Sequence, residues 1–450
     1  MYLGLHLKRC KCCCLMVKLA INGGELVAKD LVNLVPRWPV FDEDDVRAVV
    51  EAIRGGRWCR LYQGSYAERF ETEFAKYHDA KYGIAVANGT VSLELALKTL
   101  GVGLNLGDEV IVPAYTFIAT VSAVTEVGAI PIFADVDPQT GNIDPRSVEK
   151  LINERTRAII AVHFGGYPAD MDELTKIAKR HGIYLIEDAA HAHGSEWRGK
   201  KVGAIGDMGS FSFQESKSLT AGEGGIVLTN SDELADRARL IHNIGRVIGQ
   251  PGYIHYILSS NYRLSEIQAA LLLSRLRKLP SEVKVKHENG KLLADMIKRT
   301  GVVEPTRPDD RVTTRGYYYF VMLYRQEELN GIPKEVFIET LRAEGVPVGV
   351  SYGPPLYRQP AFKRENLAKS VPRYILERMP NYEELNLPGA EEFARRELVL
   401  PHHLLLAPRE ALELVVAAIE KIKEHADELQ PLVGKLKVSD TTIDATYHRM

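Results

Sequence analysis

Short apolar segments alternate with amphipathic segments from Tyr82 onward, and this alternation constrains the fold more than any other feature of the chain. Alternating strands and helices of this kind build an α/β fold, with a mostly parallel sheet sandwiched by helices. Right-handed crossovers bring the carboxyl ends of the strands to one edge, where ligands bind. The expected strands include "YGIAVA", "DEVIVP", "AIPIFADV", "RAIIAVHF" and "IYLIED", and the expected helices include "VSLELALKTL", "PRSVEKLINE" and "MDELTKIAKRHG".

The sequence predicts four parts along the chain. Residues 1–15 are expected to be a non-structural N-terminal extension, and residues 16–280 an N-terminal arm with the large sheet domain. Residues 281–430 are expected to form a small C-terminal α/β domain, in which "PKEVFIETLRAEGVPVGVSY" supplies a helix and a strand. Residues 431–450 are expected to be a weakly ordered tail.

The composition narrows the classes of partner. The chain has 450 residues, of which 45% are apolar and 26% charged, with a formal net charge of -2. This balance is ordinary for a globular protein and gives no support for nucleic acid or an anionic membrane as partner. No apolar run approaches the ~18 residues that a membrane-spanning helix needs. We therefore expect a cytoplasmic protein.

The cysteines are concentrated near the N-terminus. Four of the five lie in "RCKCCC", at Cys10, Cys12, Cys13 and Cys14. A metal site is one interpretation, but the cluster lacks the spaced CxxC pairs of zinc sites. A signal peptide is another, but the segment lacks a continuous apolar region and a small-residue cleavage site. We expect an extension that precedes the folded chain, and we predict no metal site.

Polar and small residues follow two of the predicted strands. In "VANGTVSLELAL" a strand runs into a helix that begins near Thr90, so the backbone N–H groups of Gly89, Thr90 and Val91 form a candidate anion site. An ordinary helix cap at Thr90 or Asn88 is the alternative. In "LIEDAAHAHG" Asp188 ends a strand, where it either pairs with a protonated ring nitrogen or caps a helix. His191 and His193 lack a third ligand at a metal-site spacing.

A lysine follows a third strand. "GSFSF" ends a strand, and Lys217 comes next, before the small residues of "AGEGG". Beyond another strand, Tyr115 and Phe117 are candidates to stack on a flat ligand or to pack in the core. A phosphate site, an acid, an aromatic ring and a lysine at strand ends of one sheet are the parts of a pyridoxal 5′-phosphate site.

These segments resemble the DegT/StrS-type sugar and cyclitol aminotransferases, which have the fold-type I architecture of pyridoxal phosphate enzymes. The resemblance runs from "LAINGG" to the helix near Lys421 and rests on five segments in family order. They are "ANGTVSLELAL", "VPAYTFIATVSAV", "IEDAAHAHGS", "GSFSFQESKSLTAGEGG" and "NYRLSEIQAAL".

The resemblance implies a role for each matching residue. It implies that Lys217 is the Schiff-base lysine, that Asp188 is the acid under the pyridine nitrogen, and that Phe117 is the stacking aromatic. It gives His191 a hydrogen bond to the 3-hydroxyl of the cofactor.

The remaining matches concern the phosphate and the substrate. Gly89, Thr90 and Ser212 match phosphate contacts, and Asn261 matches a residue that reaches the phosphate from a partner subunit. A homodimer with shared sites is implied. Arg263 is a candidate for a substrate carboxylate, or a surface arginine beside a helix.

Lysine at position 217 favours transamination, because the dehydratase branch of the family carries histidine there. The resemblance implies ping-pong transfer of an amino group from L-glutamate or L-glutamine to a keto-sugar or keto-cyclitol. The pattern "SFQESKSLTAGEGG" with "DAAHAHG" is similar to the glutamine:scyllo-inosose aminotransferases and to the 3-amino-5-hydroxybenzoate synthases. A dehydrating, aromatising synthase and a non-catalytic regulatory homologue are the alternatives. The sequence assigns no role to Tyr352 or to His402–His403.

Overall fold

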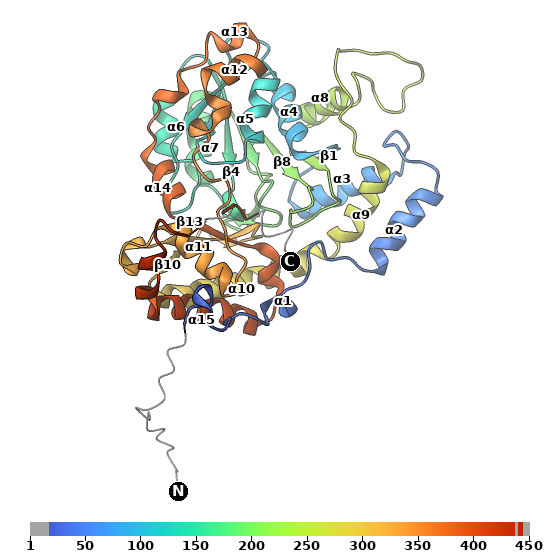
Figure 1. The fold of residues 1–450 in the computed structure, drawn as a ribbon. Coiled ribbons are helices and arrows are strands. Elements are labelled where there is room, and N and C mark those ends of the chain that lie inside the picture. The colour runs from blue at the N-terminus through green and yellow to red at the C-terminus, as the bar shows by residue number, and fades with distance from the viewer. Residues whose placement is uncertain (1–17, 437–439, 444–450) are drawn as a thin grey trace, which may run out of the picture.

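The computed structural model describes residues 18–436 and 440–443. A seven-stranded sheet with the order β1-β9-β8-β5-β4-β2-β3 forms the centre of the upper body in Figure 1. Strand β9 alone runs against the others, because it pairs antiparallel with both β1 and β8. The strands are β1 (Tyr82–Val86), β2 (Glu109–Pro113), β3 (Ile130–Ala134), β4 (Thr156–Val162), β5 (Tyr184–Asp188), β8 (Met208–Ser212) and β9 (Gly225–Thr229).

The expected mostly parallel α/β fold is confirmed, since the five strands quoted between Tyr82 and Asp188 all lie in this sheet. Its central strands β2, β4 and β8 are buried or nearly buried along their whole length, as expected for a sheet covered on both faces. The helices of this body are α2 (Glu43–Arg54), α3 (Tyr66–Tyr77), α4 (Gly89–Thr99), α5 (Ala119–Glu126), α6 (Pro145–Leu151), α7 (Met171–His181), α8 (Asp232–His242) and α9 (Glu266–Leu276).

Helix boundaries follow local capping chemistry. The Asp42 side chain accepts from the backbone N–H groups of Asp44 and Asp45 and begins α2. Ser65 and Ser265 cap α3 and α9 in the same way. Gly182 ends α7 in a left-handed conformation, which glycine adopts without steric cost.

A second body lies below the sheet in Figure 1. It contains a three-stranded antiparallel sheet in the order β10-β12-β13, and a further small sheet has the order β11-β6-β7. The helix α10 leads from the first body into it. Its elements are α1 (Leu31–Leu34), α10 (Leu279–Thr300), β10 (Val303–Pro305), β12 (Tyr319–Tyr324), α11 (Lys334–Ala343), β13 (Glu397–Pro401) and α15 (Arg409–Glu424), and the small sheet has β6 (Glu196–Trp197), β7 (Lys200–Lys201) and β11 (Val312–Thr314).

The C-terminal part of the chain contributes to both bodies. Helices α12 (Arg364–Ser370), α13 (Arg373–Leu376) and α14 (Pro388–Arg396) lie beside the large sheet in Figure 1, and Leu367, Ile375 and Phe393 belong to its apolar core. The strand expected in "VPVGVSY" is reduced to isolated bridges at Gly349 and Val350. Pro347 lacks a backbone N–H, which explains why the ladder does not extend.

We retain a division near residue 280 as a proposal, because α10 leaves the sheet layer there. Within the stretch expected to be a weakly ordered tail, Ile443 is buried and donates its N–H to Val350 at 2.9 Å. The expected extension at residues 1–15 and the four clustered cysteines lie outside the described residues.

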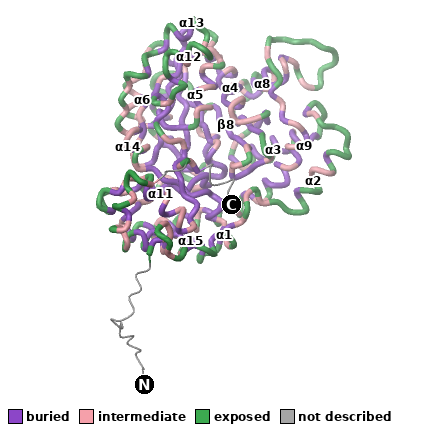
Figure 2. The backbone as a smooth tube through the Cα atoms, viewed as in Figure 1, coloured by how far each residue is buried: buried purple, intermediate pink, exposed green. Residues whose placement is uncertain are grey.

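The segment that follows residue 18 is held by one buried carboxylate. Glu344 accepts hydrogen bonds from the backbone N–H groups of Ala20 at 2.8 Å and Val27 at 3.1 Å. Lys421 on α15 pairs with Glu344 at 3.0 Å. Figure 2 shows the buried interior that this segment joins, and Leu19 and Leu31 are fully buried in the core of the second body.

Replacing Glu344 by alanine is expected to lower the free energy of unfolding by about 3–5 kcal/mol, because Lys421 is left buried without its partner. The segment around Ala20–Val27 should then become accessible to proteases in the native protein. Thermal unfolding and limited proteolysis with mass analysis measure both effects. Glu420→Ala, at an exposed position of the same helix as Lys421, should change neither. Equal behaviour of the two variants would contradict the anchoring role.

Candidate functional site

A cavity of about 700 Å³ lies at the carboxyl ends of the sheet strands. Strands β5 and β8 and the start of α4 meet there, so side chains that are far apart in sequence converge. The residues that line it are Trp38, Asn88, Gly89, Thr90, Val91, Leu93, Thr116, Phe117, Ala119, Thr120, Val162, Asp188, Ala190, His191, Ser212, Gln214, Glu215, Ser216, Lys217, Glu223, Tyr318, Tyr319 and Tyr352.

Asp188 is the last residue of β5, and its carboxylate is buried at the floor of this cavity. Thr120 donates its hydroxyl to Asp188 Oδ2 at 2.8 Å, and the Ala190 N–H donates to Oδ1 at 3.3 Å. Burial raises the pKa of Asp188 above its ordinary value, although the hydrogen bond from Thr120 acts in the opposite direction. A buried acid with two neutral donors accommodates a cationic group such as a protonated ring nitrogen.

The start of α4 faces the same cavity. Asn88 is the N-cap and accepts from the Val91 N–H at 3.0 Å, so the capping alternative considered for Asn88 is correct at this position. The N–H groups of Gly89 and Thr90, in the first turn of the helix, have no partner within the helix and remain suited to an anion. A Cβ atom on Gly89 would lie 2.6 Å from Ser212 Cβ, which explains why this position needs glycine.

Lys217 lies in the loop after β8, and its side chain is half-buried at the cavity wall. Its Nζ atom lies 4.0 Å from the centre of the Tyr318 ring, a cation–π contact. The loop turns through a hydrogen bond from the Lys217 N–H to Gln214 O at 2.9 Å. Lys217, the candidate that the sequence pattern indicated, therefore lines the cavity.

His191 and Phe117 line the cavity on another side. His191 Nε2 lies 2.9 Å from the Tyr352 hydroxyl, and the Gly165 N–H donates to Nδ1 at 3.3 Å. Burial lowers the pKa of His191 well below its ordinary value, so the ring is neutral with its proton on Nε2. Phe117 is half-exposed beside Tyr352. Tyr115, the other aromatic candidate, packs in the core instead.

Asn261 and Arg263 do not line this cavity. Asn261 is exposed, and its side chain accepts from the Arg263 N–H at 3.2 Å. The Arg263 guanidinium donates to Asn243 Oδ1 at 2.7 Å. Within one chain, the structure therefore separates these two candidates from Lys217 and Asp188.

Several lining residues carried no sequence signal strong enough to find them. Trp38 comes from the N-terminal arm, and Tyr318 and Tyr352 come from the second half of the chain. Thr120 lies three residues after Phe117, at the start of α5, and that spacing is the one signal that could have identified it.

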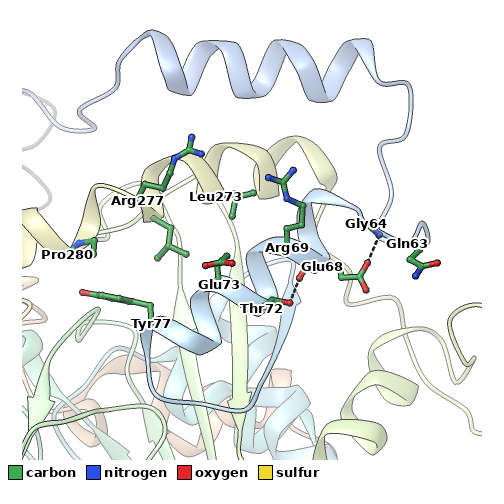
Figure 3. Close-up of a pocket in the computed structure, with 11 residues that line it drawn as sticks. Gln63, Gly64, Glu68, Arg69, Thr72, Glu73, Tyr77, Leu273, Arg277 and Pro280 are labelled. Carbon is green, nitrogen blue, oxygen red and sulfur yellow. Dashed lines mark hydrogen bonds between the residues drawn. The ribbon is translucent and has the colours of Figure 1, made fainter.

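Another cavity of about 700 Å³ lies away from the strand ends. Figure 3 shows that α3 and the end of α9 line it, with Glu73, Arg69 and Arg277 among its side chains. It contains no lysine, so it offers no amine for carbonyl chemistry. Across residues 18–436 and 440–443, no group of three or more His, Cys, Asp or Glu side chains is arranged to hold a metal ion, and no helix is long and apolar enough to cross a membrane.

The first cavity fits pyridoxal phosphate on four independent features. It has a buried acid for a ring nitrogen and free N–H groups at a helix start for a phosphate. It also has an amine at its wall, and the Ser212 side chain, which lines the cavity, packs closely against Gly89 at the helix start.

Asp188→Asn is expected to stabilise the cofactor-free protein at neutral pH. Because folding raises the pKa of Asp188, the unfolded chain releases this proton first as the pH rises above 3.8, and that release favours unfolding of the wild type. The melting temperature of the variant should exceed that of the wild type by about 1–3 °C at pH 7, and the difference should shrink toward about pH 4.

Asp172→Asn is the matched control with the opposite sign. Hydrogen bonds from Trp197 and Arg198 hold the pKa of Asp172 below its ordinary value, so its loss should lower the melting temperature at pH 7. Thermal scans of the three proteins across this pH range measure both effects. Destabilisation by both substitutions at pH 7 would contradict the account of Asp188.

Proteins of known activity are similar to this chain over nearly its whole length. An L-glutamine:2-deoxy-scyllo-inosose aminotransferase of Streptoalloteichus tenebrarius is 36% identical over 92% of this chain and 99% of its own. A 3-amino-5-hydroxybenzoate synthase of Amycolatopsis mediterranei is 37% identical over 78% of this chain and 89% of its own. The crystal structure of a 3-amino-5-hydroxybenzoic acid synthase matches with a TM-score of 0.76 and 34% identity, over 87% of this chain and 99% of that one.

The sequence profile of the DegT/DnrJ/EryC1/StrS aminotransferase family matches residues 39–420. The expectations of this family, of an aminotransferase and of pyridoxal 5′-phosphate as cofactor are confirmed. The chain belongs to the DegT/DnrJ/EryC1/StrS aminotransferase family.

Proposed function

We propose that this protein transfers an amino group from L-glutamine or L-glutamate to a keto-cyclitol by a ping-pong mechanism. The observation that carries the proposal is the convergence of Lys217, Asp188 and the start of α4 on one cavity. The likeness to an L-glutamine:2-deoxy-scyllo-inosose aminotransferase supports the choice of donor and acceptor.

Pyridoxal phosphate, when bound, supplies an electron sink for the electrons left at the amino acid Cα. We propose that Asp188 holds its ring nitrogen, that His191 contacts its 3-hydroxyl, and that Phe117 stacks on its ring. The phosphate would be held by Gly89, Thr90 and Ser212, with Asn261 contributed by a partner subunit. The burial of Asp188 supports its role, because a carboxylate in a low-dielectric site binds a cation strongly.

Lys217 both anchors the cofactor and moves the proton in this proposal. Lys217, which lines the cavity wall, would supply the amine that takes the proton from the donor Cα. The centre of the Tyr318 ring lies 4.0 Å from Nζ, a contact that orients the amine at the cavity wall. The neutral His191 does not compete for this proton, since burial disfavours its charged form.

The charge of the cavity favours a keto-cyclitol over a nucleotide-linked keto-sugar. Among the described residues that line it, Lys217 is the only lysine or arginine, whereas Glu215 and Glu223 are acidic. Lysine and arginine side chains recognise diphosphates, and this wall lacks them. Tyr318, Tyr352 and the glutamates instead offer hydrogen-bonding groups for the hydroxyls of a neutral ring.

A second candidate is a dehydrating, aromatising synthase, which the likeness to a 3-amino-5-hydroxybenzoate synthase favours. The product distinguishes the two reactions. Amino transfer to scyllo-inosose retains every hydroxyl and replaces only the ketone oxygen, by an amino group. The synthase reaction instead loses water and forms an aromatic ring. A regulatory homologue would produce neither.

We also propose a cytoplasmic homodimer with shared sites. A long loop follows α8 in Figure 1, and Figure 2 shows it as exposed. Its apolar residues Tyr253, Ile254 and Leu258 face solvent in a single chain, and exposed apolar clusters of this kind mark interfaces. Asn261 follows this loop directly, which supports its proposed contact with the phosphate of a second copy.

Lys217→Ala is expected to abolish both cofactor attachment and turnover. The wild-type protein loaded with pyridoxal phosphate should show a visible absorbance band at roughly 410–430 nm that L-glutamine or L-glutamate bleaches, and scyllo-inosose should restore it. The variant should show neither the band nor the bleaching. Lys201→Ala, which changes a lysine outside the cavity, is the control and should behave as wild type. A loaded wild type that no amino donor bleaches would contradict the proposed function.

Leu258→Asp is expected to weaken the dimer and reduce turnover, since a charge would be placed in the proposed interface. Light scattering should give twice the chain mass for the wild type and a lower average mass for the variant. Leu104→Asp changes an exposed leucine on another loop and should leave the mass unchanged. A wild-type mass of one chain at micromolar concentration would contradict the dimer.

A further inference from the structure

Lys217 lies in a loop that is held by residues from three distant parts of the chain. We call residues 214–218 the lysine loop. The Trp38 indole N–H donates to Glu215 O at 2.9 Å, and the imidazole of His402 bonds Ser216 O through Nε2 at 3.1 Å. These bonds reach the backbone of the two residues that immediately precede Lys217.

The side chain of Ser216 adds a third contact. Ser216 donates its hydroxyl to Gln214 Oε1 at 2.7 Å, so the 2.7 Å contact between Ser216 Oγ and the Tyr318 hydroxyl has Tyr318 as its donor. Tyr318 also lies under Lys217 Nζ. One phenol therefore contacts both the lysine loop and the amine that the loop carries.

The residue after Lys217 is held as well. Ser218 donates its hydroxyl to Tyr317 O at 2.9 Å, and the same oxygen accepts from Lys286 Nζ at 3.3 Å. Tyr317 has a φ of 45°, a conformation that is rare for a bulky residue. A Cβ on Gly290 of α10 would lie within 2.5 Å of the Tyr317 ring, so the packing that holds this turn needs glycine there.

His402 connects these contacts to the second body. It follows β13 directly and is fully buried, with its ring 4.4 Å from that of Trp38 in an edge-on arrangement. Since Ser216 O can only accept, Nε2 carries the proton, and burial lowers the pKa of His402 so that the ring is neutral. The imidazole does not line the cavity; it bonds the lysine loop directly and packs against the rings of Trp38 and Tyr318, which do line it.

We propose that His402 is a positioning residue for Lys217: its Nε2–H bond to the Ser216 carbonyl sets the backbone from which Lys217 reaches the cavity. This inference deepens the proposed function and rests on it for the role of Lys217. Reactions of positioned groups are sensitive to displacements of about 1 Å, so loss of this bond should slow the chemistry of Lys217 more than it weakens substrate binding.

The first measurement uses the full-length cofactor-free protein. Pyridoxal phosphate is added, attachment is trapped with borohydride at successive times, and the mass of the Lys217 peptide gives the rate of capture. His402→Leu should slow capture by about 10-fold or more, because leucine cannot donate to Ser216 O. His402→Gln, whose side-chain amide can donate in place of Nε2, should recover most of the rate.

The matched control is His242→Leu. His242 is also a buried neutral histidine whose Nε2 bonds a backbone carbonyl, that of Ala85 at 3.0 Å, but it does not touch the lysine loop. It should lower thermal stability as His402→Leu does and leave the capture rate at the wild-type value. A similar slowing in both leucine variants, or a wild-type rate in His402→Leu, would overturn the inference.

The second measurement separates this inference from the proposed function. In the loaded proteins, His402→Leu should slow the bleaching of the visible band by L-glutamine, shift the pH midpoint of that band, and leave the L-glutamine concentration for half-maximal rate within about 2-fold of wild type. A wild type that captures the cofactor at Lys217 but never bleaches would overturn the proposed function, while the capture rates would still decide the role of His402. A wild type with no capture at Lys217 would overturn both.

Discussion

A carboxylate buried at the end of a parallel strand is the constraint on which the rest of the site depends. Asp188 is placed in the cavity by β5, where Thr120 and the Ala190 N–H donate to its carboxylate. A buried carboxylate is stabilised by a cation close to it. The amine of Lys217 lies against the Tyr318 ring at the cavity wall and forms no ion pair with Asp188 among the described contacts. We therefore propose that the site holds a cationic ring between Asp188 and Lys217, and that the buried acid lowers the stability of the cofactor-free chain.

The position of a lysine, and not a lowered pKa, is the ground on which we propose Lys217 as the lysine that does the chemistry. Lys286 is fully buried, and burial lowers its pKa to about 7, a value that would make it an attractive nucleophile. Its amine bonds the Tyr317 carbonyl and does not line the cavity. Lys217 lines the cavity together with Asp188 and the start of α4, so one cavity offers an amine, an acid for a ring nitrogen and N–H groups for a phosphate. Lys286 supports the Tyr317 carbonyl, and the same carbonyl accepts from Ser218, the residue that follows Lys217.

The sequence predicted the sheet that carries the site. It did not predict which residues from other parts of the chain line or support the cavity. The alternation of apolar and amphipathic segments predicted β1 to β5 and β8, and the ends of these strands pointed to Asp188, Gly89 and Lys217. The sequence did not identify Trp38, Tyr352 or His402, because their contacts at the site are with residues more than 100 positions away. No local pattern encodes such contacts. The resemblance to a family added roles for Asn261 and His191 that one chain alone does not test.

The most direct test of the account follows the nitrogen. The loaded protein is incubated with L-glutamine labelled with ¹⁵N at the α-amino group or, separately, at the side-chain amide, and the cofactor is recovered after denaturation. If Lys217 and Asp188 perform amino transfer, the recovered cofactor carries ¹⁵N from the α-amino label and none from the amide label. Unlabelled cofactor with both labelled glutamines and also with α-¹⁵N-labelled L-glutamate, or label that comes from the amide, would contradict the central claim.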